Sequence, residues 1–351
     1  MSETNTNPKI NPPVPSSNAA TALASIEVDD GDLTEDASTM DDRISSYSAS
    51  LTSSIIDYPE EYGRRYHAYR AGSYQFPNDE REIDRLDFNH TLIARTTGQL
   101  FLAPIEKDKT HRILDVGTGT GIWAIEIGDG FPNAEVVGID LSAIQPSFVP
   151  PNVKFEIDDA ESSWVGNAKY DFIFSRYLAL SIANWPRLVG NIYTNLNNNG
   201  WAEFQDYSLT LDSDDGTLTD DHQTMKWQKW GNEIAEKIGR DFNPGPKLRN
   251  WVAEAGFRNI VHKHYKIPVG PWAKGAHYKE IGMLNLMQLL DGLEAFTLRP
   301  FCGVLGWTTE EAQVLRANVR KEIKSGAFHA HLNYHVVYGQ KVESEGEKEG
   351  E

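Results

Sequence analysis

A turn that contains Gly117, Gly119 and Gly121 is the feature of this chain that is best suited to chemistry. An apolar run, residues 113–116, leads into the turn and reads as a strand, and an apolar, helix-like stretch follows it. Because glycine has no Cβ and adopts positive φ easily, backbone in such a turn can pass close to a bound nucleotide.

A carboxylate stands at the distance from this turn that a nucleoside site requires. Asp140 ends the next apolar run, residues 136–139, and lies 19 residues beyond Gly121. An acid about 20 residues past a glycine turn of this kind accepts hydrogen bonds from ribose hydroxyls. The two strands, the turn and the acid together predict a site for a nucleoside cofactor.

The residues around the turn favour one cofactor over another. A dinucleotide-binding turn would have its third glycine at position 122, where this chain has Ile122. Asp115 precedes the turn, and its charge would oppose a pyrophosphate. The same carboxylate suits the amino group and sulfonium of S-adenosylmethionine. The alternative is an ordinary strand-to-helix turn whose glycines only allow tight packing.

Two further strand ends carry polar side chains. Residues 153–157 read as a strand followed by Asp158 and Asp159, and residues 170–174 read as a strand followed by Arg176 after one serine. Ligands of parallel sheets bind at the carboxyl ends of the strands. We therefore expect Asp158 or Asp159 to accept a hydrogen bond from adenine, with a solvated acidic turn as the alternative. Arg176 is predicted to contact the cofactor as well.

Residues 55–98, which precede the glycine turn, are expected to be helical. His90 falls on the apolar face of that segment and is predicted to be a packed, hydrogen-bonded histidine rather than a catalyst. Arg64 or Tyr66 is predicted to bind the carboxylate of the cofactor's methionine by a charge-assisted hydrogen bond. A surface arginine pair on a helix is the alternative for this segment.

Several short motifs in one order resemble the class I S-adenosylmethionine-dependent methyltransferases, and more closely their fungal LaeA-like branch. The resemblance covers roughly residues 50–340. It is carried by residues 62–67, 100–105, 117–123, 140–146, 155–161, 270–272 and 292–296.

The resemblance implies an α/β fold: a Rossmann-like seven-stranded sheet, mostly parallel, with helices on both faces, a reversed final hairpin and a helical cap. It implies that the methionine part of the cofactor lies among Asp115, Gly117, Thr118, Gly119 and Gly121. It further implies contacts to the ribose from Asp140 and Leu141, and to the adenine from Asp159 and Ala160. Phe174 stands where relatives often carry histidine, so no role of that histidine transfers.

The composition limits the classes of function. The chain has 351 residues and a formal net charge of −18, which argues against a nucleic-acid surface. Cys302 is its single cysteine, so neither an intrachain disulfide nor a cysteine-rich metal site is expected. No apolar run approaches a membrane span, and the ten histidines lack the spacing of a metal site. We expect a cytoplasmic protein, with the nucleus as the alternative.

The pattern along the chain predicts four parts, all with approximate boundaries. They are an acidic disordered leader (1–50), an N-terminal helical cap (51–110), a methyltransferase domain (111–341) with helical insertions at about 218–255 and 274–325, and a disordered tail (342–351). Helices are expected at 218–239, 245–255 and 274–293. The last is apolar around most of its girth, which predicts burial under the cap or in a homodimer interface. A further helix is expected to begin at Thr308, with Glu311 completing a capping box.

Methyl transfer from a sulfonium needs alignment more than acid assistance, and it needs a base only for a hydroxyl or protonated amine acceptor. The candidate bases are Asp206, Tyr207, His222 and His277. Each has a structural alternative. Asp206 would cap a loop, and Tyr207 would pack as an aromatic side chain at the rim of the site. His222 would begin a helix on the solvent side, and His277 would form a hydrogen bond within a turn.

The aromatic residues of the expected insertions give the clue to the acceptor. Trp227, Trp230 and Trp272 are predicted to line an apolar pocket for a flat or prenylated small molecule, with core packing as the alternative. Three functions are considered. The first is methylation of a small molecule in fungal secondary metabolism. The second is a LaeA-like regulator that acts in the nucleus with protein partners, and a cofactor-binding scaffold without turnover is a weaker third.

Overall fold

The computed structural model describes residues 58–66, 76–164 and 169–343. The chain divides into Met1–Ser50 and Leu51–Glu351, and every described residue belongs to the second unit. The expected disordered leader therefore lies outside the described residues, as does most of the expected tail.

A seven-stranded sheet forms the centre of the fold, with the strand order β5-β4-β3-β6-β7-β9-β8. The five strands from β5 to β7 are parallel, and β9 runs antiparallel between β7 and β8. This arrangement confirms the predicted fold class, including the reversed final hairpin. The strands are β3 (Arg112–Val116), β4 (Glu135–Asp140), β5 (Val153–Ile157), β6 (Tyr170–Arg176), β7 (Leu196–Asp212), β8 (Arg258–Pro268) and β9 (His331–Gln340).

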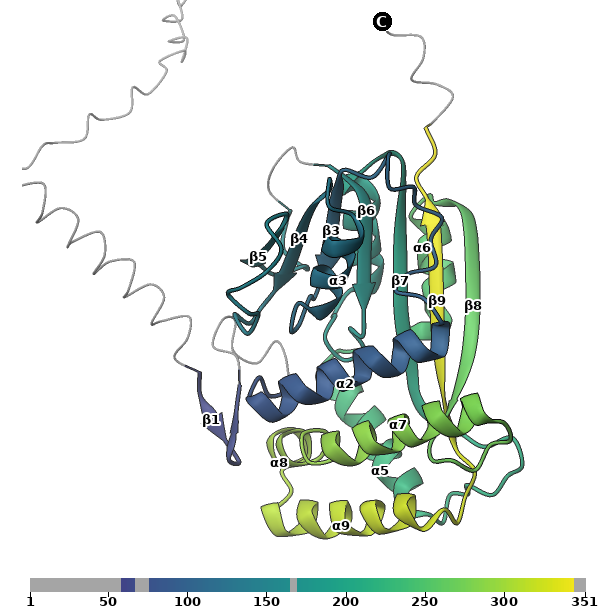
Figure 1. The fold of residues 1–351 in the computed structure, drawn as a ribbon. Helices are drawn as coiled ribbons and strands as arrows, with labels where there is room; N and C mark the ends of the chain where they lie inside the picture. The colour runs from purple at the N-terminus through teal and green to yellow at the C-terminus, as the bar shows by residue number, and fades with distance from the viewer. Residues whose placement is uncertain (1–57, 67–75, 165–168, 344–351) are drawn as a thin grey trace, which may run out of the picture. The chain divides into compact units, whose positions relative to one another are not determined.

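Helices cover both faces of the sheet because successive strand residues point to opposite sides. Ile113 of β3 packs in the core with Trp123 of α3 (Ile122–Gly130). Its neighbour Leu114 packs in a second core with α4 (Trp185–Asn195) and with α6 (Leu248–Glu254). Figure 1 shows α3 and α6 on opposite sides of the strands.

Five further helices gather beyond one end of the sheet, where Figure 1 shows them stacked below the strands. They share a third core with the ends of β7, β8 and β9, and we call them the helical cap. They are α2 (Glu80–Thr97), α5 (Gln223–Lys237), α7 (Ala276–Gly292), α8 (Leu298–Leu305) and α9 (Thr309–Ser325). The sequence patterns did not predict α8. The predicted capping box between Thr308 and Glu311 is confirmed.

The prediction of a helical segment over residues 55–98 is only partly correct. Residues 60–65 form a short antiparallel pair, β1 (Glu60–Glu61) and β2 (Arg64–Arg65), whose turn contains Gly63 at φ +73°. Helix α2 begins only at Glu80, because the Asp79 side chain accepts a hydrogen bond from the Glu82 amide and caps it. Residues 67–75 lie outside the described part of the chain.

Two other helix predictions need correction. The segment expected as one helix at 245–255 is a 3₁₀ turn, η1 (Gly245–Lys247), followed by α6. Helix α7 is not buried all round: Met283 and Met287 are 42% and 45% exposed. Its buried face includes Asn285, whose amide donates to the carbonyls of Ile267 and Pro268 at the end of β8. Hydrogen-bond partners on β8 decide which face of α7 is buried, and the hydrophobic periodicity of the helix does not reveal them.

Candidate cofactor site

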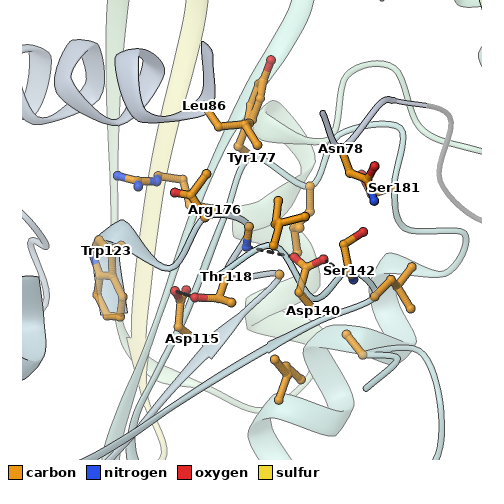
Figure 2. A pocket seen from close by; sticks show the side chains of 18 of the residues that line it. Asn78, Leu86, Asp115, Thr118, Trp123, Asp140, Ser142, Arg176, Tyr177 and Ser181 are labelled. Atoms are coloured by element: carbon orange, nitrogen blue, oxygen red, sulfur yellow. Dashed lines mark hydrogen bonds between the residues drawn. The ribbon is translucent and has the colours of Figure 1, made fainter. Parts of the chain in front are cut away.

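A cavity of about 160 Å³ lies between the carboxyl ends of β3, β4, β5 and β6 and helix α2. Figure 2 shows side chains from these strand ends and from α2 converging on it. The cavity therefore lies where the strand-end rule places a ligand site. Of the residues predicted to bind the cofactor, those that line this cavity are Asp115, Gly117, Thr118, Gly119, Asp140, Leu141, Asp158, Asp159, Ala160 and Arg176.

Asp140 is held in place by backbone amides at the edge of the cavity. Its Oδ2 accepts a hydrogen bond from the Gly119 amide at 2.9 Å, and its Oδ1 accepts one from the Ser142 amide at 2.9 Å. The first bond ties the acid at the end of β4 to the glycine turn after β3 (Figure 2). A carboxylate fixed in this way is preorganised to accept hydrogen bonds from a ribose, which fits the predicted role.

The three glycines of the turn have different tasks, although all adopt positive φ. A Cβ on Gly119 would meet no heavy atom closer than 3.9 Å, so this position opens onto the cavity. A Cβ on Gly121 would lie 2.4 Å from the ring of Phe155. Gly121 is not among the residues that line the cavity, and its missing Cβ allows it to pack against Phe155 of β5; its contact with the cofactor stays a prediction.

Asp115 is a buried acid in the floor of the cavity. The hydroxyl of Thr118 donates to its Oδ2 at 2.6 Å. Burial raises the pKa of Asp115 to about 7, an effect that the Thr118 hydrogen bond and the charge of Arg176 oppose. A positively charged group placed beside this carboxyl would favour its ionised form. That property suits the amino group of a bound methionine.

His90, on α2, is a member of the site whose place in the cavity wall sequence reasoning missed. Arg176 donates from Nη2 to Nδ1 of His90 at 2.8 Å, and Nε2 of His90 lies 3.1 Å from Glu126. Because a guanidinium only donates, Nδ1 must accept and Nε2 must carry the proton. Burial and the charge of Arg176 lower the pKa of His90 to about 3. The imidazole is therefore neutral and positions Arg176, in agreement with the predicted packed histidine.

The two acids after β5 shape the turn that borders the cavity. Oδ1 of Asp158 accepts from the Asp159 amide at 2.8 Å, and Oδ1 of Asp159 accepts from the Glu161 amide at 2.9 Å. Both residues line the cavity, so the contact with adenine stays a prediction for each of them.

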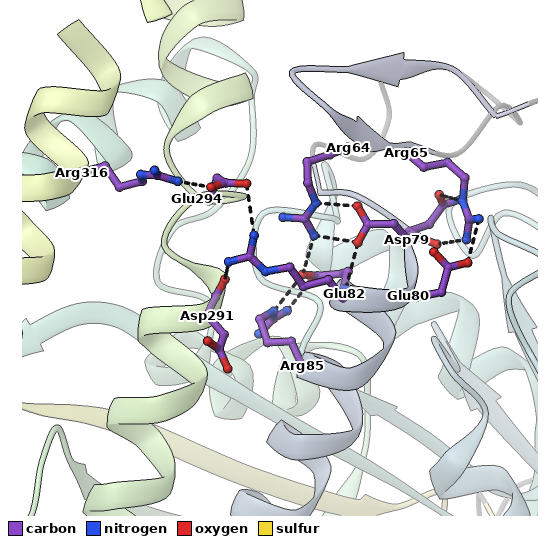
Figure 3. A network of polar contacts seen from close by, with 11 residues as sticks. Arg64, Arg65, Asp79, Glu80, Glu82, Arg85, Asp291, Glu294 and Arg316 are labelled. Carbon is purple, nitrogen blue, oxygen red and sulfur yellow. Dashed lines mark hydrogen bonds and ion pairs between the residues drawn. The ribbon is translucent and has the colours of Figure 1, made fainter. Parts of the chain in front are cut away.

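Arg64 and Tyr66 do not line the cavity, and we correct the prediction for both. Arg64 forms a two-armed ion pair with Asp79, at 2.5 Å and 2.8 Å, which Figure 3 shows beside the start of α2. Tyr66 is buried under the guanidinium of Arg299, which lies 4.1 Å from the ring centre. The turn between β1 and β2 thus directs these residues to α2 and to the cap instead of the cofactor.

None of the four candidate bases lines this cavity. Asp206 accepts hydrogen bonds from the amides of Leu178 and Tyr207, and burial raises its pKa to about 7. This is the structural alternative, since the carboxyl organises the loop after β6. Nδ1 of His222 accepts from the Thr219 amide at 3.1 Å, and His277 is exposed at the start of α7. The structure thus places Asp206, His222 and His277 away from this cavity, and the role of a base stays a prediction for each of them.

Tyr207 lines a second cavity of about 100 Å³, which lies between β7, α5 and α7. Tyr177 and Ser181 line both cavities, so the two spaces adjoin. Of the three tryptophans predicted to form an apolar pocket, only Trp227 lines this second cavity. Trp230 packs against Trp307 instead, and Trp272 stacks on His329, which are the packing alternatives for these two residues.

The described residues form neither a metal site nor a membrane-spanning helix. No group of three or more His, Cys, Asp or Glu side chains among them is arranged to hold a metal ion. Of the helices built from these residues, none combines the length and the hydropathy that a membrane span needs.

Comparison with known proteins identifies the family of this chain. The methyltransferase domain family matches residues 87–262. The methyltransferase PytC of Aspergillus terreus is 47% identical over 294 residues, which cover 83% of this chain and 90% of PytC. The chain belongs to the methyltransferase family. This methyltransferase uses S-adenosylmethionine, as members of the family do, and the cavity described above is its candidate site.

Other relatives of this methyltransferase are LaeA-like proteins, which confirms the predicted branch. The secondary metabolism regulator LAE1 of Cochliobolus heterostrophus is 38% identical, covering 79% of this chain and 92% of LAE1. The protein-methionine methyltransferase laeA of Emericella nidulans is 32% identical, covering 80% of this chain and 76% of laeA. Among solved structures, phosphoethanolamine N-methyltransferase 2 of Haemonchus contortus is 16% identical over 84% of this chain, with a TM-score of 0.48.

Proposed function

We propose that this methyltransferase transfers the methyl group of S-adenosylmethionine to a small molecule of fungal secondary metabolism. The observation that carries the proposal is the second cavity, which adjoins the cofactor cavity and has walls that are mostly apolar. A small molecule enclosed there would present its reactive atom at the boundary formed by Tyr177 and Ser181. The name of the relative PytC, a methyltransferase, supports an enzymatic role.

The residues of the cofactor cavity bind and orient the cofactor, and the bonds that form and break are those of the cofactor and the acceptor. When bound, S-adenosylmethionine supplies a sulfonium methyl group: the acceptor's lone pair forms the new bond to carbon, and the pair of the broken C–S bond stays on sulfur as a neutral thioether. The protein contributes alignment, with Asp140, proposed to bind the ribose, fixed by the Gly119 amide and with Arg176 fixed by His90. An acceptor that carries a proton releases it to water.

Incubation of the purified protein with methyl-labelled cofactor and fungal extract tests this proposal. We expect label in the organic-soluble small-molecule fraction, and we expect Asp140→Ala to abolish it. Label recovered only in protein would overturn the small-molecule proposal while leaving the methyltransferase assignment intact.

A second candidate function is regulation of secondary metabolism within a protein complex. The observation that favours it is the similarity to LAE1 and to laeA of Aspergillus fumigatus, which are named secondary metabolism regulators. Affinity purification of the tagged protein from fungal cells separates the two functions. Stable recovery of nuclear proteins would support regulation, and recovery of the protein alone or as a homodimer would support the enzyme.

We propose the cytoplasm as the site of the enzyme, with the nucleus as the site of the regulator. Fluorescence microscopy of a full-length fusion distinguishes them. Accumulation in the nucleus would contradict the cytoplasmic proposal.

A further inference from the structure

The polar groups that line the second cavity are already engaged with the protein itself. Oε1 of Gln228 accepts from the Leu211 amide, and its Nε2 donates to the Leu209 carbonyl. The hydroxyl of Tyr207 donates to Asn89 at 3.2 Å. What these residues offer to a ligand is therefore their carbon surface rather than hydrogen-bonding groups.

Gln288, the remaining amide in the wall, is engaged in the same way. Its Oε1 accepts from Arg85 at 3.2 Å, and its Nε2 donates to Asn285 at 3.0 Å. Among the described residues, no Asp, Glu, His, Lys or Arg lines this cavity. A charged ligand would lose its hydration there without finding a counter-ion, which is strongly unfavourable. The walls thus favour an uncharged, predominantly apolar molecule.

Tyr177 stands between the two cavities in an unusual backbone conformation. It follows β6 directly and has a φ of +61°, which is rare for a large side chain and is kept only where surrounding contacts enforce it. Its ring packs edge-on against Tyr207, with the ring centres 5.5 Å apart. The residue therefore lies at the boundary that the two cavities share, and Figure 2 shows its ring beside the cofactor cavity.

Arg85 of α2 supplies the contacts that hold Tyr177 in place. Its Nη1 donates to the Tyr177 hydroxyl at 3.3 Å, and its guanidinium lies 5.0 Å from the ring centre of Phe296 in the wall of the second cavity. Glu82 binds the same guanidinium through two hydrogen bonds of 2.9 Å and 2.6 Å, and Figure 3 shows this pair beside Arg64 and Asp79. A buried, paired guanidinium of this kind restricts the movement of whatever it contacts.

We propose that the second cavity is the acceptor pocket, that it takes an uncharged, predominantly apolar small molecule, and that Tyr177, held by Arg85, positions the acceptor's reactive atom at the cofactor. The proposal rests on the proposed function, because it assigns the acceptor of that same reaction. Tyr177 acts here as a positioning residue.

Binding of prodan, an uncharged naphthalene dye whose emission shifts to the blue in apolar surroundings, tests the pocket. We expect saturable binding to the full chain. Leu209→Trp places an indole in the cavity, so we expect it to weaken prodan binding about tenfold or more while S-adenosylmethionine binds as before in calorimetry. Asp140→Ala should weaken the binding of S-adenosylmethionine and leave prodan binding unchanged. Val314→Trp, at an exposed site on α9, should change neither.

These outcomes separate the failure of this proposal from the failure of the proposed function. Wild-type protein that binds S-adenosylmethionine but not prodan, or prodan binding that Leu209→Trp leaves unchanged, would overturn the acceptor pocket alone. Absence of S-adenosylmethionine binding would instead overturn the proposed function. If Leu209→Trp loses both ligands through misfolding, Gly231→Leu fills the same cavity from α5, where an added Cβ meets only the Phe242 ring.

The positioning role of Tyr177 predicts thermodynamic coupling between the cavities. We expect saturating S-adenosylhomocysteine to change the prodan dissociation constant about threefold or more in the wild-type protein. Tyr177→Ala should remove this coupling, and Tyr177→Phe, which keeps the ring, should retain part of it. Equal coupling in wild type and Tyr177→Ala would show that Tyr177 only packs.

Discussion

The Nη2 atom of Arg176 lies 2.8 Å from Nδ1 of His90, and this contact fixes both the tautomer of the imidazole and the direction of the guanidinium. His90→Phe removes the acceptor and leaves Arg176 free to turn out of the cavity. We expect the affinity for S-adenosylmethionine to fall about tenfold, or ~1.4 kcal/mol, as measured by calorimetry. His90→Gln, whose amide oxygen can accept, is the matched control and should lose less. Equal losses in both variants would contradict the positioning role.

The raised pKa of Asp115 predicts that cofactor binding depends on pH. The carboxyl is protonated in the free protein below its pKa of about 7. A bound ammonium group favours the carboxylate, so binding releases a proton and the affinity rises as pH increases through 7. Calorimetry between about pH 6 and 8 should show this rise, and Asp115→Asn should abolish it. A flat profile in the wild-type protein would refute the contact.

The different surroundings of Gly119 and Gly121 predict different defects. Gly121→Val would drive a branched side chain into the Phe155 ring at φ +82°. We expect it to lower the free energy of unfolding by about 2 kcal/mol or more. Gly119→Val is also strained, at φ +58°, but its side chain enters the cavity without a clash, so it should lose less stability than Gly121→Val while it loses cofactor binding. Urea unfolding and calorimetry on the same samples test both, and stable Gly121→Val protein would disprove the packing role.

Asp206 predicts a pH dependence of stability. Burial raises its pKa in the folded protein to about 7 from an ordinary value of 3.8. Between these values the folded state holds a proton that the unfolded state releases, so this group's contribution to stability declines as pH rises from 4 through 7. Asp206→Asn does not titrate. Its stability relative to wild type should therefore increase between about pH 5 and 8 in urea unfolding. A constant difference would contradict the raised pKa.

The buried ion pair of Arg85 and Glu82 predicts that removing one charge alone lowers the free energy of unfolding more than removing both. Both side chains are almost fully buried, at 2% and 1% exposure. Arg85→Met leaves the Glu82 carboxylate without its main counter-ion, so we expect a loss of about 3 kcal/mol in the free energy of unfolding. The double variant Glu82→Gln/Arg85→Met should recover part of this loss. Additive losses would show that the two residues do not interact.

Much of the sheet and of the cofactor cavity was predictable because the signals are local. Apolar runs gave the strands around residues 113–116 and 136–139, and the spacing from Gly121 identified Asp140. The N-cap of α9, Thr308, was predictable because a capping box needs only Glu311, three residues further along the chain. The role of Gly121 was missed because it depends on Phe155, a residue of another strand.

The helical cap was less predictable because its partners are distant in sequence. Arg64 was predicted to bind the carboxylate of the cofactor. Its guanidinium carries several hydrogen-bond donors, and it does bind a carboxylate. The structure gives it Asp79, a carboxylate of the protein itself. Tyr177 could have been suspected from its place at the end of the fourth parallel strand, but nothing local indicated its positive φ or its contact with Arg85.

The sequence by itself determined that this protein has a methyltransferase sheet and a glycine turn flanked by Asp115 and Asp140. These features follow from backbone preferences and spacing within short segments. Only the tertiary structure decided which side chains face the cavities, because burial and pairing depend on groups that meet after folding. The contact of Arg85 with Gln288, 203 residues away, and the second cavity arise only when the cap packs onto the sheet.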